Sequence, residues 1–345
     1  MNTPNVPPAA STMSFFEMLD RTFRVYRQHF SRYVTLTASI LIPITLATLV
    51  INIANASRLT TSFSSTSRAS SASALSAVCG ASTFLLILSI IQIVLVNGSI
   101  TYLASENYLN RDPSISEALR ATLNRSRTLG CGYLIFFALI VAFGFVIAFA
   151  GALCNPLFAA AGLIVYLGIA TYAFLAPVLV LEDVGVSQGV NRAWTLGKAR
   201  FWTAFWLITI IVIITYVISI AFTGVAEVIS LTVLRSNSQV LSLIIDQTLT
   251  TATQIFITPI LPIGLTLLYH DTRNRLEGLD FTLQALGKSD ARPSDVVSPA
   301  AQPSLNSKDL LNIGIVVGVS VVLALIASSF IQSYVNSFVP SSIGR

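Results

Sequence analysis

Charged residues are scarce in this chain of 345 residues, and the shortage decides its class. Asp, Glu, Lys and Arg make up 10% of the residues, compared with about 25% in an ordinary soluble domain. Hydrophobic residues make up 54%. Because 20 Lys and Arg with 15 Asp and Glu cannot cover a folded chain of this size with charge, the composition excludes a soluble protein and predicts one surrounded by lipid.

Cysteine and histidine are also few, which excludes several kinds of site. Cys79, Cys131 and Cys154 lie in apolar stretches without CxxC spacing, a pattern typical of buried thiols that act as small hydrophobic groups. His29 and His270 have no cysteine or histidine at metal-ligand spacing. We therefore expect neither a metal nor a cofactor.

Recognisable catalytic motifs are missing as well. The sequence contains no P-loop, no GxGxxG and no HExxH. The segment Gly185-Val-Ser187-Gln-Gly189 matches the GxSxG pattern of hydrolases, but that nucleophile elbow requires a preceding strand. Here it follows an apolar span and overlaps the start of an amphipathic helix. We therefore expect no catalysis by Ser187 and interpret the chain as a protein that is not an enzyme.

Long apolar stretches are what the chain has instead. A membrane-spanning helix needs about 20 mostly apolar residues, because lipid cannot satisfy the hydrogen bonds of the backbone. Seven stretches meet this requirement, at about 34–55, 75–101, 131–153, 157–181, 204–225, 241–268 and 310–331. The tripeptide Ala54-Asn55-Ala56 imitates a signal-peptidase site, but the long region before the first stretch favours an uncleaved signal anchor.

The basic residues divide unequally between the two sides of these spans. Of the 20 Lys and Arg, 16 lie before the first span, in every second loop or after the sixth span, and four lie on the other side. Cytoplasmic loops are enriched in Lys and Arg. The distribution therefore predicts a cytoplasmic N-terminus and an external C-terminus.

Three segments that each precede a span align without gaps. Each begins with a helix-capping pattern, of which the third is the weakest: Ser14-Phe-Phe-Glu17, Ser114-Ile-Ser-Glu117 and Gly185-Val-Ser-Gln188. In the same register each segment later carries one basic residue, which is Arg27, Arg127 or Lys198. We interpret the three segments as copies of one amphipathic helix.

The first copy shows the amphipathic pattern most clearly. Its apolar residues recur at helical spacing and share one face: Phe16, Leu19, Phe23, Tyr26, Phe30 and Tyr33. The other face carries the acid-first pairs Glu17 with Arg21 and Asp20 with Arg24. Such a helix is typical of the plane of a membrane surface, where arginine is attracted to anionic lipid. The alternative interpretation is that these helices only seal the cytoplasmic side of the bundle.

These patterns together predict an all-α integral membrane protein with about seven transmembrane helices. It consists of three repeats, each an in-plane amphipathic helix plus a transmembrane hairpin, with one appended C-terminal transmembrane helix. The expected division is a disordered N-terminus (1–13), a polytopic membrane domain with six spans (14–287), a Pro/Ser-rich linker (288–309), the C-terminal transmembrane helix (310–331) and an external tail (332–345).

Three further features leave alternatives open. Gly314 and Gly318 form a GxxxG spacing, which suits a homodimer or packing within the chain, although the spacing can also arise by coincidence. The mixed-charge segment that contains Arg273 and Arg275 is either a self-paired cytoplasmic cap or a surface that docks a partner. Prolines inside the spans, at Pro43, Pro177, Pro259 and Pro262, favour packing kinks or the discontinuous helices of a transport site.

Two polar motifs in the loops resemble a known bacterial family. The first motif is the run Pro177-Val-Leu-Val-Leu-Glu-Asp183, which leads to Arg192-Ala-Trp194 and Phe201-Trp202. The second is Tyr269-His-Asp-Thr-Arg-Asn-Arg-Leu-Glu-Gly-Leu-Asp280. Over about residues 15–286 the chain resembles the membrane domain that precedes the catalytic domain of some bacterial glycerophosphoryl diester phosphodiesterases, and its stand-alone relatives of unknown function.

The resemblance implies a location and an auxiliary role, because the catalytic domain has no counterpart in this sequence and no phosphodiesterase residue carries over. We expect a multi-pass protein of the bacterial cytoplasmic membrane that acts as a scaffold or a lipid-associated accessory protein. Its expected partners are lipids of the anionic leaflet and a protein partner or second copy, and no nucleic acid. The candidate contacts are Arg27, Arg127, Lys198, Arg273 and Arg275. The alternative function is a transporter or channel for a small or lipidic solute.

Overall fold

The computed structural model describes residues 13–63, 68–153, 161–233, 239–286, 291–297, 299 and 305–338, and these residues contain helices and no strand. The helices are α1 (Phe15–Gln28), α2 (Phe30–Phe63), α3 (Arg68–Tyr108), α4 (Ile115–Asn124), α5 (Ser126–Leu153), α6 (Ala161–Leu181), α7 (Val186–Ala199), α8 (Phe201–Val233), α9 (Gln239–Ile257), α10 (Ile260–Glu277), α11 (Leu279–Ala285), the 3-10 helix η2 (Pro293–Asp295) and α12 (Ser307–Phe338). The expected all-helical class is confirmed for the described ranges.

Six helical stretches are long and apolar enough to cross a membrane. They are Phe30–Ala54 in α2, Thr83–Tyr108 in α3, Ser126–Phe145 in α5, Gly162–Leu181 in α6, Phe201–Val225 in α8, and Leu243–Glu277, which α9 and α10 form together. The predicted seventh span lies in α12, whose side chains are described only as far as Val322. The number of seven spans therefore stays a prediction.

Apolar side chains cover the outside of these stretches. In the α8 span 11% of the most apolar window is buried inside the molecule, and Ile213, Val217 and Ile220 are all more than half exposed. Cys131, which we expected to be buried, is likewise exposed, on α5. A helix that is apolar on all sides and yet poorly covered by protein requires lipid around it.

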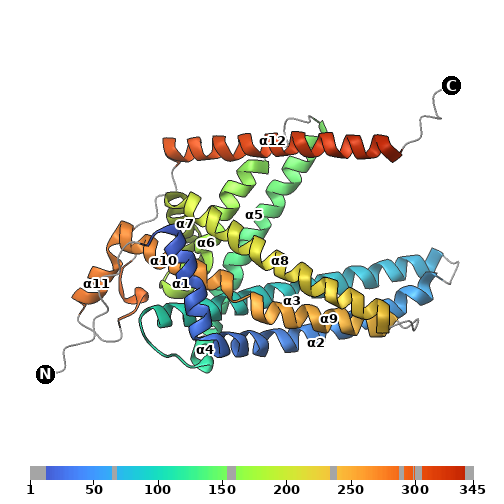
Figure 1. Ribbon diagram of the computed structural model, residues 1–345, viewed down its shortest axis with the longest axis horizontal. Coiled ribbons are helices and arrows are strands. Elements are labelled where there is room, and N and C mark those ends of the chain that lie inside the picture. The colour runs from blue at the N-terminus through green and yellow to red at the C-terminus, as the bar shows by residue number, and fades with distance from the viewer. Residues whose placement is uncertain are drawn as a thin grey trace.

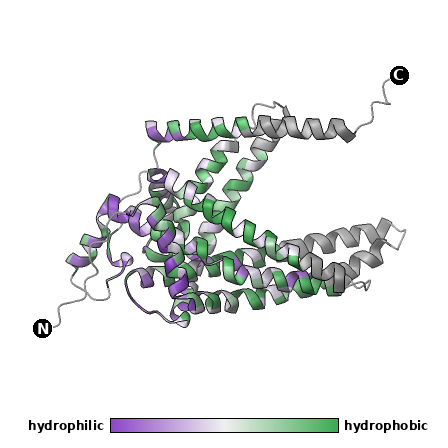
Figure 2. Ribbon diagram, in the orientation of Figure 1, coloured by the Kyte–Doolittle hydropathy of each residue, from purple (hydrophilic) through white to green (hydrophobic). Residues whose placement is uncertain are grey.

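The long helices fall into two groups that meet at one end of the molecule (Figure 1). In one group α2 packs against α3 and α9, and α9 also packs against α8. In the other group α5 packs against α6, and α12 crosses over α6. The short helices α1, α4, α7 and α11 gather at the end where the groups meet, and Figure 2 shows that hydrophilic residues are concentrated there. We call this region the polar end.

The three short helices α1, α4 and α7 begin as the sequence predicts. Capping boxes are confirmed at Ser14 and Ser114, whose hydroxyls accept hydrogen bonds from the backbone N–H of Glu17 and Glu117 at 3.3 and 3.2 Å. Gly185 begins α7 without a side-chain cap. In each case a single residue separates the short helix from the long helix that follows it. The repeat itself and the orientation of these helices in a membrane stay predictions.

The helix α7 lies directly on α6 because a glycine allows the two backbones to touch. A Cβ atom at Gly197 would lie 1.8 Å from the carbonyl oxygen of Ala170. Any larger residue would therefore force the helices apart. This close approach places Glu182, just after the end of α6, beside Arg192 on α7.

Candidate functional site

Glu182 lies at the centre of a buried network of charges at the polar end. Its carboxylate lies 3.3 Å from the Nε atom of Arg192 and 3.5 Å from an Nη atom of Arg273, and it accepts a hydrogen bond of 3.0 Å from the hydroxyl of Tyr269. Glu277 completes the network, because it pairs with both Arg192 and Arg273. Two glutamates and two arginines therefore neutralise one another away from water.

This network joins the two motifs on which the family resemblance rests. Glu182 and Arg192 belong to the first motif, which α6 and α7 carry, and Tyr269, Arg273 and Glu277 belong to the second, on α10. The charged side chains are at most 11% exposed, and Tyr269 is fully buried. The network is thus an internal brace that fixes α6, α7 and α10 to one another.

Asp271 forms a second buried centre one step away along α10. It pairs with Arg200 at 3.1 Å and with Arg275 at 2.9 Å, and it accepts a hydrogen bond from the backbone N–H of Met13. Arg275 in turn donates to the carbonyl oxygen of Met13 at 2.7 Å. Burial lowers the pKa of Arg200 below its usual value. These contacts attach the start of α1 and the α7–α8 junction to α10.

His270 lies between these two centres and is fully buried. Its Nε2 atom lies 3.0 Å from the hydroxyl oxygen of Ser105, and its ring stacks on Tyr108 at 4.3 Å between centroids. Its Nδ1 atom has no hydrogen-bond partner among the described residues. The histidine thus links α10 to the end of α3 by packing and by one hydrogen bond.

The first residues of α12 attach to the polar end through polar contacts. Asp309 lies 3.9 Å from the Nζ atom of Lys198 and accepts a hydrogen bond from the hydroxyl of Tyr166 at 3.3 Å. The indole N–H of Trp202 donates to Asn312 at 3.0 Å. The helix that follows the predicted linker is therefore docked on α6, α7 and α8.

The five candidate contact residues separate into exposed and internal positions. Arg27 and Arg127 are exposed, and neither pairs with a carboxylate among the described residues. Lys198 and Arg273 are buried in pairs with Asp309, Glu182 and Glu277, and Arg275 is bound to Asp271 and Met13. Lys198 and Arg273 thus lie inside the protein, where Asp309 and Glu182, both distant in the sequence, reach them.

Gly314 and Gly318 do not pack against the described part of the chain itself. A Cβ atom at either position would meet nothing there within 4 Å. Packing of α12 on α6 instead uses Gly162, where a Cβ atom would lie 2.6 Å from the Cα atom of Val317. Packing within the chain at Gly314 and Gly318 is therefore not found among the described residues, and homodimerisation and coincidence both stay open.

The described residues contain no group of three or more His, Cys, Asp or Glu that could hold a metal ion. The GxSxG segment lies at the start of α7 and follows a helix, α6, rather than a strand. The buried charged groups neutralise one another, and their ion pairs join α6, α7, α10 and α12 at the polar end.

Comparison with models of protein families, with characterised proteins and with solved structures finds no match for this chain. The functional argument therefore rests on the geometry of the polar end.

Proposed function

We propose that this chain is a non-enzymatic, polytopic membrane protein that acts as a scaffold or lipid-associated accessory protein at an anionic membrane surface. One observation carries the proposal: Arg27, Arg120 and Arg127 are exposed at the polar end without a carboxylate partner among the described residues. Most other arginines of that end are paired. The unpaired cations come from α1, α4 and the first turn of α5, beside the predicted membrane surface.

Exposed apolar side chains accompany these arginines on the short helices. Phe16 of α1 is 77% exposed and lies on the same helical face as Arg27, because a step of eleven residues makes about three turns. On α4, Leu123 is 56% exposed and is one turn from Arg120. Cations that share a helix with outward apolar side chains are typical of helices that bind the interface of anionic lipid.

The test compares two double variants with the same change in charge. Arg27→Gln with Arg127→Gln removes two unpaired arginines, and Arg24→Gln with Arg32→Gln removes two arginines that pair with Asp20 and Asp112. Each protein is placed in nanodiscs of mixed phosphatidylglycerol and phosphatidylcholine, and the lipids bound after extraction are quantified by mass spectrometry.

We expect the first double variant to lose most of the enrichment in phosphatidylglycerol, since each basic residue near an anionic surface contributes about 1 kcal/mol. The second should lose less of it, because each of its arginines has a neighbouring acid that offsets part of its attraction to anionic lipid. Equal enrichment in wild type and in the Arg27/Arg127 variant would remove the basis of the proposal.

The location is part of the same proposal. The excess of basic residues on one side of the spans and the resemblance to the membrane domain of bacterial glycerophosphoryl diester phosphodiesterases support a bacterial cytoplasmic membrane, with the N-terminus cytoplasmic and the C-terminus external. The polar end then faces the cytoplasm.

Transport of a small or lipidic solute is the second candidate, and one observation favours it. The sixth span is interrupted between α9 and α10 at Thr258 and Pro259, and discontinuous helices can form transport sites. If this candidate is right, Pro259→Ala should abolish flux of the solute through proteoliposomes, whereas Arg27→Gln with Arg127→Gln should leave that flux unchanged. The scaffold proposal expects no effect of Pro259→Ala on lipid enrichment.

A further inference from the structure

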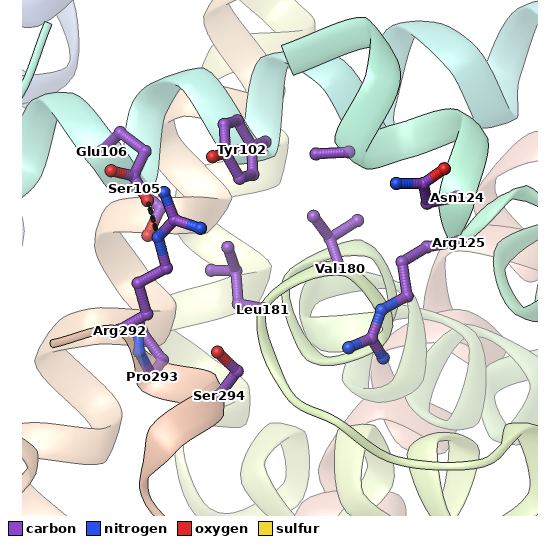
Figure 3. Close-up of a pocket in the computed structure, with 11 residues that line it drawn as sticks. Tyr102, Ser105, Glu106, Asn124, Arg125, Val180, Leu181, Arg292, Pro293 and Ser294 are labelled. Atoms are coloured by element: carbon purple, nitrogen blue, oxygen red, sulfur yellow. Dashed lines mark ion pairs between the residues drawn. The ribbon is translucent and has the colours of Figure 1, made fainter. Parts of the chain in front are cut away.

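A polar cavity of about 190 Å³ lies at the polar end where four segments meet. Its lining comes from the end of α3, the junction of α4 and α5, the end of α6 and the segment 291–297. Figure 3 shows Arg125 and Arg292 on opposite sides of it, with Val180 and Leu181 between them. At about 30 Å³ for each water molecule, the cavity has room for several waters or for a phosphate group.

The charges around this cavity leave an excess of one positive charge. Glu106, which lines it, is held by Arg111 at 3.4 Å and by Arg292 at 3.1 Å. Arg125 pairs at 2.9 Å with Asp183, whose side chain is 79% exposed. Three arginines thus face two carboxylates. Arg125 also donates to the backbone carbonyl oxygen of Glu182 at 3.1 Å. Because a carbonyl is neutral and a pair with an exposed carboxylate is weak, the charge of Arg125 is only partly neutralised.

Neutral donors add to the two guanidinium groups. The side-chain amide of Asn124 and the hydroxyl of Ser294 line the cavity, and neither makes a hydrogen bond within the described residues. Guanidinium groups match the geometry of phosphate oxygens, which accept two parallel hydrogen bonds. The lining is therefore rich in donors and cations that suit a phosphate group, and Glu106 is the one acid among the described residues that form it.

The segment 291–297 belongs to the predicted linker but is docked over the cavity. The carbonyl oxygen of Ala291 accepts a hydrogen bond of 2.8 Å from Arg111, and the guanidinium of Arg292 lies 5.8 Å from the centre of the Tyr102 ring. Ala291 and Pro293 are buried, whereas the side chain of Arg292 is half exposed. The segment thus places the half-exposed side chain of Arg292 at the cavity, beside Glu106 and Tyr102.

We propose that this cavity binds a phosphate group between Arg125 and Arg292, either as free phosphate or as the headgroup of a phospholipid. The inference does not depend on the proposed lipid-surface function, because its cations are different residues and line a cavity. It gives the docked part of the linker a role in binding.

The first arm of the test uses inorganic phosphate with the full-length protein in detergent. Thermal unfolding is measured with increasing phosphate at constant ionic strength, with chloride as the reference salt. We expect phosphate to raise the Tm of wild type, and Arg125→Gln and Arg292→Gln each to weaken the apparent affinity about tenfold, because they remove charge-assisted hydrogen bonds. Arg32→Gln is the matched control, since it also loses an arginine that pairs with an exposed carboxylate at this end.

A variant that should bind phosphate more tightly shows whether misfolding explains the weaker binding of the arginine variants. Glu106→Gln removes the acid from the lining and frees two arginines, so phosphate should bind more tightly than to wild type, an effect that misfolding cannot produce. The second arm measures phospholipid that stays bound to each protein, by native mass spectrometry after extraction from membranes that contain phosphatidylglycerol.

The two arms separate the sources of the phosphate group. A Tm response to inorganic phosphate that follows Arg125, Arg292 and Glu106 supports a site for free phosphate, and bound phospholipid that is lost in the same arginine variants supports a headgroup site. If neither response depends on these residues, the proposal is overturned. The Arg27/Arg127 variant tests the lipid-surface proposal separately, because those residues do not line the cavity. Its result therefore does not bear on phosphate binding in the cavity.

Discussion

At the scale of single residues, the buried acids of the polar end are shared between arginines of different helices. Glu182 accepts from Arg192, Arg273 and Tyr269, and Asp271 accepts from Arg200, Arg275 and the backbone of Met13. Removing one partner of a buried pair leaves the other charge without compensation, which costs about 3 to 5 kcal/mol. These acids should therefore matter more for stability than exposed acids nearby.

Glu182→Ala should strongly destabilise the protein, by about 3 to 5 kcal/mol, because Arg192 and Arg273 would then share Glu277 alone. The neighbouring Asp183→Ala is the control, since Asp183 also pairs with an arginine but is largely exposed, and it should cost about 1 kcal/mol or less. Thermal unfolding in detergent measures both. Similar Tm values for the two variants would contradict a bracing role for Glu182.

Partners of this kind could not be predicted from the sequence. Arg192 and Glu277 are 85 positions apart, and Tyr269 and Glu182 are 87 apart. Helical spacing indicates which residues share a face of one helix, but not which helix lies opposite. For this reason the alignment of Lys198 with Arg27 and Arg127 predicted a surface cation at all three positions. In the fold, Asp309 lies beside Lys198. Of the two predicted pairs at a spacing of four, Asp20 with Arg24 forms because it is local. Arg21 instead contacts the sulfur of Met13 and the ring of Tyr108.

At the scale of helices, the starting points of the short helices follow from local sequence. The capping boxes at Ser14 and Ser114 need only residues three positions apart. Where one short helix meets the next long helix was less predictable: α1 and α7 are 14 residues long, but α4 is 10. As a result Arg127 lies in the first turn of α5, whereas Arg27 lies in the last turn of α1.

The missing cap of α7 allows a stabilising change. Gly185 has φ −72° and ψ 165°, which any residue can adopt, and a Cβ atom there would meet no described atom within 4 Å. Gly185→Ser should supply the cap and reduce the freedom of the unfolded chain, a gain of roughly 0.5 to 1 kcal/mol. Amide exchange in the first turn of α7 should then slow by about two- to fivefold. Gly185→Ala controls for chain entropy, and a greater slowing in Ala than in Ser would argue against the cap.

The docking of α12 depends on a glycine of another helix. Gly162→Leu should push α12 away from α6, because even a Cβ atom at this position would lie 2.6 Å from the Cα atom of Val317. We expect faster amide exchange in residues 307–322 of α12. Gly314→Leu adds the same side chain where the described fold has open space, and it should leave exchange in a monomeric protein unchanged. If amide exchange in α12 became faster in both variants, the added leucine itself, and not loss of the contact between α6 and α12, would explain the change.

At the scale of the whole molecule, the described helices agree with a chain that returns to one end after every second span. The starts of α2, α5, α8 and α12 and the ends of α3, α6 and α10 all lie towards the polar end (Figure 1). Composition and span spacing were sufficient to predict this alternation, because lipid requires helices of a minimum length. The packing of α7 on α6 depends on close contacts such as Gly197 with Ala170, which hydropathy does not reveal.

This alternation predicts on which side of the membrane each loop is accessible. In a protein with its three native cysteines replaced by serine, a single cysteine at Ser116 of α4 should be protected from a membrane-impermeant maleimide added to intact cells, and one at Ser236 should be labelled. These two positions calibrate the cytoplasmic and the external side. A cysteine at Ser341 then decides the role of α12, because labelling at this position requires the helix to cross the membrane. Protection of Ser341 together with labelling of Ser236 would mean that both ends of α12 lie on the side of the polar end, and the chain would have six spans.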